Sequence, residues 1–144
     1  MKKILFSFLV LVSFSTFGQI TFNTGDAGFD AELNVINKEA TKDLVTFKNN
    51  LSTEFGVTVA KIEGLLKEMN PAEALLSVKI SSIAKQPLEK VVESYKSNKD
   101  KGWGYIAKEM GIKPGSAEFH ALKGKKNNSA KPANSNSKGK GKGK

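Results

Sequence analysis

The sequence contains no cysteine and no arginine, and only one histidine, among its 144 residues. Without cysteine the chain has no disulfide, no thiolate zinc or iron–sulfur site, no cysteine nucleophile and no lipid-bearing cysteine behind a signal peptide. With His120 alone it has neither a serine triad with a histidine base nor a pair of histidine metal ligands. We therefore predict no metal site and no cofactor.

The acidic residues are scattered singly along the chain, a pattern typical of solvated helix faces and not of a general acid/base pair. We predict that the protein is not an enzyme. The alternative is an enzyme with a carboxylate-based site, which requires Asp and Glu side chains clustered in a pocket.

The one long apolar run lies at the N-terminus. Three residues, Met1 to Lys3, form a positive start, and the apolar stretch 4–17 is too short to span a bilayer comfortably. Thr16 and Gly18 are small enough for the −3 and −1 pockets of a signal peptidase. We predict a signal peptide over residues 1–18 and a mature chain without a transmembrane segment, exported to the periplasm, the cell envelope or the medium. An uncleaved anchor is the alternative.

The formal net charge of +9 is unevenly distributed. Thirteen lysines face fourteen Asp and Glu residues between Gln19 and Leu122, whereas residues 123–144 contain eight lysines and no acid. This last segment consists almost entirely of Lys, Gly, Asn, Ser and Pro, a composition that cannot offset the entropy of ordering. The sequence predicts a disordered basic tail over 123–144.

Hydrophobic spacing in the remainder predicts an all-α fold, a small bundle of about five or six short helices over residues 29–122. An irregular segment, 19–28, precedes it, with a possible short strand at Ile20 and Phe22. Apolar residues recur at i, i+3, i+4 and i+7 most clearly over 88–95 and 103–110. Residues 29–40 fit a helix or a strand.

Capping residues divide the helices. Asn70, Pro71 and Glu73 are typical of a helix start, although residues 76–80 also alternate as a strand does. Pro87 is expected at the first position of the next helix. Thr58 and Ser116 are expected to cap helices, and Gly56 and Gly111 to end them. Gly64 within a helix requires compensating packing or a closely approaching neighbour.

The candidate binding residues of the bundle are Trp103, Tyr105 and Lys108. Gly102 and Gly104 flank Trp103 before a helix, where backbone amides can hold an anion. Trp103 and the nearby tyrosines could also form an exposed stacking platform for a sugar or a base. The favoured interpretation places Trp103 in the core, because it belongs to the apolar stripe of its helix.

Further candidate binding residues lie in the basic tail, where lysine acts as a hydrated point charge suited to nonspecific attraction to a polyanion. They are Lys125, Lys126, Lys138, Lys140, Lys142 and Lys144.

The segment 103–112, followed by a helix from Ser116 to Leu122, has the spacing of a helix-turn-helix. A recognition helix at that place would present Glu118 and no arginine to the bases. A nucleic-acid-binding domain of this kind is the alternative to our main hypothesis.

The segment GWGYIAKEMGIKPGSAEFHALK, from Gly102 to Lys123, together with the Lys/Gly/Asn tail, resembles a group of small exported bacterial helical proteins of uncharacterised function. The resemblance covers mainly residue 57 to the C-terminus. It implies export and a helical domain, and brings no ligand or catalytic residue.

The hypothesis from sequence is a non-enzymatic protein of the periplasm or cell envelope. Its helical domain would hold a protein partner, and its tail would bind an anionic polymer such as lipopolysaccharide or extracellular nucleic acid. A tail that serves only solubility is the alternative.

Overall fold

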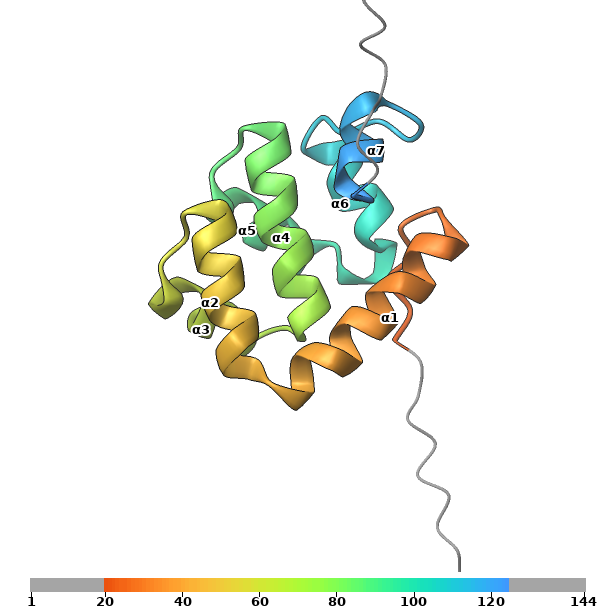
Figure 1. Cartoon of the computed structure of the whole chain (residues 1–144). Coiled ribbons are helices and arrows are strands. Elements are labelled where there is room, and N and C mark those ends of the chain that lie inside the picture. The colour runs from red at the N-terminus through yellow and green to blue at the C-terminus, as the bar shows by residue number, and fades with distance from the viewer. Residues whose placement is uncertain (1–19, 125–144) are drawn as a thin grey trace, which may run out of the picture.

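A computed structural model describes residues 20–124, which form seven α-helices, one short 3-10 helix and no strand (Figure 1). The all-α prediction is confirmed, with more helices than the five or six expected. The predicted signal peptide and all but the first two residues of the predicted basic tail lie outside the described residues. The elements are α1 (Ala27–Lys42), α2 (Leu44–Phe55), α3 (Val59–Leu66), α4 (Pro71–Ala84), α5 (Leu88–Ser97), η1 (Lys99–Lys101), α6 (Trp103–Glu109) and α7 (Ala117–Leu122).

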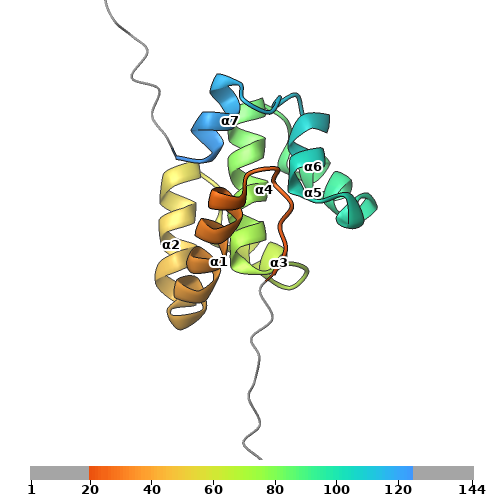
Figure 2. The same ribbon diagram turned by 90° about the vertical axis from the view of Figure 1, so that its right-hand side faces the viewer.

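Helix α4 is the centre of the bundle and contacts α1, α2, α3, α5 and α7 (Figures 1 and 2). It begins with a complete capping box, in which Asn70 Oδ1 accepts from the Glu73 amide and Glu73 Oε2 accepts from the Asn70 amide. Leu76, Val78 and Ile80 are all buried. Because helices surround α4, its apolar residues need not share one face, which explains the strand-like alternation; the strand alternative is wrong.

Capping residues set the boundaries of the first three helices. Asp26 accepts from the Phe29 amide and starts α1, so residues 29–40 are helical. Asp43 alone separates α1 from α2 and caps α2. Gly56, with φ +66°, ends α2 in the left-handed conformation, and Thr58 caps α3. The predictions for Gly56 and Thr58 are confirmed.

The C-terminal helices follow the predicted stripes, with one correction. Pro87 precedes α5 as its N-cap and is not its first helical residue, because its ψ of 138° keeps it extended. Trp103, Ile106 and Met110 are buried along α6. Ser116 accepts from the Phe119 amide and caps α7, as predicted.

Residues 20–26 form an irregular segment without a strand, with positive φ angles at Asn23 and Gly25, so the short strand considered at Ile20 and Phe22 is wrong. The segment runs between α1 and α6 (Figure 2). Asn34 of α1 holds Ile20 by two hydrogen bonds, of 3.1 Å to its amide and 3.0 Å to its carbonyl oxygen. Phe22 is 1% exposed. The backbone groups of this segment form their hydrogen bonds with α1 and with the start of α6, and not with a neighbouring strand.

The two ends of the described chain meet at an ion pair. Lys123 Nζ lies 2.7 Å from Asp26 Oδ2, and these side chains are 12% and 33% exposed. On the same side of the fold, Lys79 of α4 donates to the carbonyl oxygen of Leu122 at the end of α7.

The described helices include none long and apolar enough to cross a membrane.

Candidate functional site

Trp103 lies in the core. It is 3% exposed, and its ring stacks on Tyr95 with the ring centroids 5.1 Å apart and the planes at 23°. The favoured interpretation is confirmed, and an exposed stacking platform at Trp103 is wrong, because Tyr95 covers one face of the indole and the core encloses most of the remainder.

The amides at the start of α6 are already occupied, so the proposed anion site is wrong. Trp103 N–H donates to the Phe22 carbonyl oxygen at 2.8 Å, and Gly104 N–H donates to that of Asn23 at 2.9 Å. A Cβ on Gly102 would lie 2.3 Å from Asn23 Cβ, and φ at Gly102 is +81°. The two glycines therefore allow close approach of the N-terminal segment.

Tyr105 and Lys108 lie on the exposed side of α6, away from the buried Trp103. Tyr105 is 40% exposed, and Lys101 Nζ lies 4.5 Å from the centroid of its ring. The structure therefore does not bring the three predicted bundle residues together. The tail residues Lys125, Lys126, Lys138, Lys140, Lys142 and Lys144 lie outside the described part of the chain.

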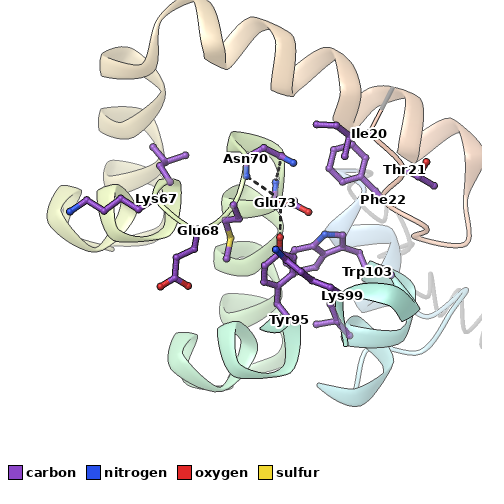
Figure 3. Close-up of a pocket in the computed structure, with 14 residues that line it drawn as sticks. Ile20, Thr21, Phe22, Lys67, Glu68, Asn70, Glu73, Tyr95, Lys99 and Trp103 are labelled. Atoms are coloured by element: carbon purple, nitrogen blue, oxygen red, sulfur yellow. Dashed lines mark hydrogen bonds between the residues drawn. The ribbon is translucent and has the colours of Figure 1, made fainter. Parts of the chain in front are cut away.

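A cavity of about 530 Å³ lies where the N-terminal segment, the α3–α4 turn, α5 and α6 meet (Figure 3). Its apolar lining includes Phe22, Met69, Trp103 and Ile106. The capping box holds the start of α4 at its edge, and the stack of Tyr95 on Trp103 fixes the wall formed by α5 and α6. Its volume is within the range of small-ligand pockets, roughly 300–1,000 Å³, and its lining is both polar and apolar.

Glu73 and Tyr95 form the polar centre of the cavity. Glu73 Oε2 accepts from the Tyr95 hydroxyl at 3.1 Å and from the Asn70 amide at 3.0 Å, as the dashed lines in Figure 3 show. Burial, followed by the negative charge of Glu73, raises the pKa of the Tyr95 hydroxyl. Tyr95 is therefore a hydrogen-bond donor and not a base.

Charged residues stand around this centre. Lys99 Nζ lies 4.9 Å from the centroid of the Tyr95 ring, and Figure 3 shows Lys99 beside Tyr95 and Trp103. Glu68, also in the lining, pairs with Lys96 at 2.7 Å. Lys99 belongs to none of the ion pairs among residues 20–124, so its ammonium group is available to an anionic partner.

Among the polar cavity residues, only Tyr95 was considered for a site from sequence, as one of the tyrosines near Trp103 in the stacking platform, which is wrong. Glu73 was interpreted as a capping residue and Tyr95 also as part of an apolar stripe, and these two interpretations are correct. Lys99 lies in η1, between the apolar stripes of residues 88–95 and 103–110. Local sequence patterns could not predict that Glu73, Tyr95 and Lys99 lie close together, because the three residues belong to different elements.

No protein-family model matches the chain. Searches of curated proteins and of solved structures likewise give no significant match. The site is therefore interpreted from its own geometry.

Two other hollows lie on the surface. One, of about 520 Å³ between α3 and α5, is lined by Gly64, Leu65, Leu88 and Val92. A Cβ on Gly64 would meet nothing within 4 Å, so no neighbour within the described chain explains that glycine. The other, of about 350 Å³, contains Ser94 of α5, which donates a hydrogen bond to Glu109 of α6.

The histidine and the acids show no metal-binding arrangement. Within residues 20–124, no three His, Asp or Glu side chains lie close enough together to hold an ion. His120 is half-buried on α7. The ionisable and amide side chains in the lining of the cavity of Figure 3 are the carboxylates of Glu68 and Glu73, the amide of Asn70, the phenol of Tyr95 and the ammonium groups of Lys67 and Lys99.

Proposed function

We propose that the protein is an exported, non-enzymatic protein of the periplasm or cell envelope that attaches to an anionic polymer through its lysine-rich C-terminal segment. The helical domain would then serve to hold a protein partner. The observation that carries the proposal is the charge distribution, with eight lysines and no acid after Leu122 and near balance before it.

The charges of the helical domain favour this division of roles. Ion pairs of 2.6–2.7 Å tie four of the thirteen lysines before Leu122 to carboxylates. Two of these pairs join parts distant in sequence, Lys61 of α3 with Glu89 of α5 and Lys96 of α5 with Glu68 of the α3–α4 turn. A lysine already paired with a carboxylate attracts a polyanion less strongly than an unpaired one.

Lys123 belongs with the domain and not with the polymer-binding segment. Its ammonium group pairs with Asp26 and lies 5.1 Å from the Phe119 ring centroid. Seven lysines, between Lys125 and Lys144, remain for the polymer. Each phosphate neutralised should contribute about −0.9 to the slope of log K against log salt on duplex DNA, and about −0.7 on single strands.

The test compares the mature chain from Gln19 with a version that ends at Gly124, since an earlier end would remove Lys123 and its ion pair. Both are titrated against DNA and against lipopolysaccharide at several salt concentrations. We expect truncation to abolish binding. A matched control keeps the full length but replaces the seven lysines with glutamine, and it should fail to bind as well.

Two outcomes would contradict the proposal. If the version ending at Gly124 binds DNA as tightly as the mature chain, the binding site lies in the helices, as the helix-turn-helix alternative requires. If the mature chain binds neither polymer, the basic segment acts only on solubility. Export is tested separately by mass spectrometry of the protein from the exported fraction, where we expect Gln19 as the first residue.

A further inference from the structure

We propose that the cavity between the N-terminal segment, α4, α5 and α6 binds a short apolar peptide. Glu73 and Asn70 would bond its backbone, and Lys99 would pair with its terminal carboxylate. This site is separate from the basic segment and does not depend on polymer attachment.

The cavity has room and an apolar floor for a side chain. Its volume of about 530 Å³ lies within the usual range for small-ligand pockets, roughly 300–1,000 Å³. Ile20 and Leu66, which are both partly exposed, line it above the buried side chains of Phe22 and Ile106. Burying an aliphatic side chain against such a surface stabilises a complex in proportion to the apolar area removed from water.

Two polar atoms of the lining have hydrogen-bonding capacity to spare. Glu73 Oε2 accepts both of that carboxylate's hydrogen bonds, while Oε1 accepts none from residues 20–124. Asn70 Oδ1 accepts from the Glu73 amide, while its Nδ2 donates to none of these residues. Since no buried side-chain oxygen or nitrogen in this range lacks a partner, both atoms are accessible. An acceptor beside a donor matches the N–H and C=O of a peptide.

Lys99 supplies the charge for a carboxylate. Its ammonium group is over the Tyr95 ring, and the hydroxyl of the same Tyr95 bonds Glu73. One tyrosine thus brings the cationic and the anionic group within reach of a single small ligand. A peptide with a free C-terminus carries the complementary groups.

Other ligand classes fit less well. A phosphate monoester would bring nearly two negative charges towards the carboxylates of Glu73 and Glu68, where a peptide terminus brings one. A fatty acid would leave Glu73 Oε1 and Asn70 Nδ2 without partners once it displaced water from them. A sugar would need an open aromatic face, whereas Trp103 is 3% exposed.

The test uses the fluorescence of Trp103, the only tryptophan of the chain, which lines the cavity. Mature protein is titrated with the tripeptide alanyl-alanyl-leucine and with the same peptide amidated at its C-terminus. We expect a saturable change, half-complete at or below about 1 mM. Amidation should weaken binding about three- to fivefold, as expected for a partly exposed ion pair.

Lys99→Ala should weaken binding of the free acid by the same factor and leave the amidated peptide unaffected. Lys113→Ala, which removes the same charge from the exposed loop before α7, is the control and should change neither affinity. Glu73→Gln, checked for folding by its melting curve, should weaken the binding of both peptides.

The absence of saturation up to about 10 mM would overturn the proposal. Equal affinity of acid and amide for the wild type, or unchanged discrimination in Lys99→Ala, would overturn the role of Lys99.

Discussion

Two glycines inside helices have opposite surroundings. A Cβ on Gly104 of α6 would lie 2.7 Å from the Thr24 carbonyl oxygen, whereas a Cβ on Gly64 of α3 would meet nothing within 4 Å. The first glycine is required by contact with the N-terminal segment. The second lowers helix stability without any such contact within the described residues.

We therefore expect Gly104→Ala to lower the free energy of unfolding by about 1–3 kcal/mol, because the backbone of the N-terminal segment must move away. Gly64→Ala should raise it by about 0.5–1 kcal/mol, because alanine favours the helix. Denaturant midpoints of the two variants and the wild type measure both effects. A destabilised Gly64→Ala would contradict the open surroundings described for that position.

At the scale of elements, caps decide where the helices begin. The capping box at α4 joins Asn70 and Glu73 by reciprocal hydrogen bonds of 3.1 and 3.0 Å. It fixes the start of the helix against which α1, α2, α3, α5 and α7 pack. A substitution in this capping box should therefore lower the stability of the whole bundle.

Asn70→Ala should lower the free energy of unfolding by about 1 kcal/mol, and by up to about 2 kcal/mol, because the first turn of α4 loses its side-chain acceptor. Asn49→Ala, on the exposed side of α2, is the control and should stay within about 0.5 kcal/mol of the wild type. Chemical denaturation followed by helix circular dichroism measures both. Equal stabilities of the two variants would show that the cap is dispensable.

The elements were largely predictable because their signals are local. Asn70, Thr58 and Ser116 act within one helical turn, and so does Gly56 at the end of α2. The positions of Gly102 and Gly104 could not be explained in this way, because the atoms that require them belong to residues 22–24, about eighty positions earlier. The sequence shows two glycines beside a tryptophan and not the segment that lies against them.

The cavity could not be predicted from the sequence either, because the residues that line it come from distant parts of the chain. Glu73, Tyr95 and Lys99 each follow a local rule for a cap, a stripe or a charged turn. Only packing brings their polar atoms together. Conversely, the basic segment is recognisable from composition alone, because its eight lysines and its lack of acids are read directly from the sequence.

At the scale of the whole molecule, the pair between Asp26 and Lys123 predicts a pH dependence of stability. The hydrogen bond from Lys123 and the Phe29 amide lower the pKa of Asp26 below its ordinary value of 3.8. A carboxyl group whose pKa falls on folding stabilises the fold fully above its unfolded pKa. This stabilisation is lost as the pH falls through the folded pKa.

Lys123→Ala should therefore lower stability at neutral pH and reduce the loss of stability below about pH 4. Denaturant midpoints between about pH 2.5 and 7 measure the two curves. Lys113→Ala, which removes an exposed lysine from the loop before α7, is the control and should leave the shape of the curve unchanged. Parallel curves for Lys123→Ala and the wild type would contradict the contribution of the pair.

The same pair joins residues 97 positions apart. A further tie links the Phe22 carbonyl oxygen to the start of α6. A polypeptide is made from its N-terminus, so the segment that begins the described fold is also the one that waits longest for its partners. Helices α1 to α4 can associate while the chain is still being extended, but the bundle can close only after α7 has emerged. Any machinery that handles the growing chain meets an open bundle for almost the entire time of synthesis.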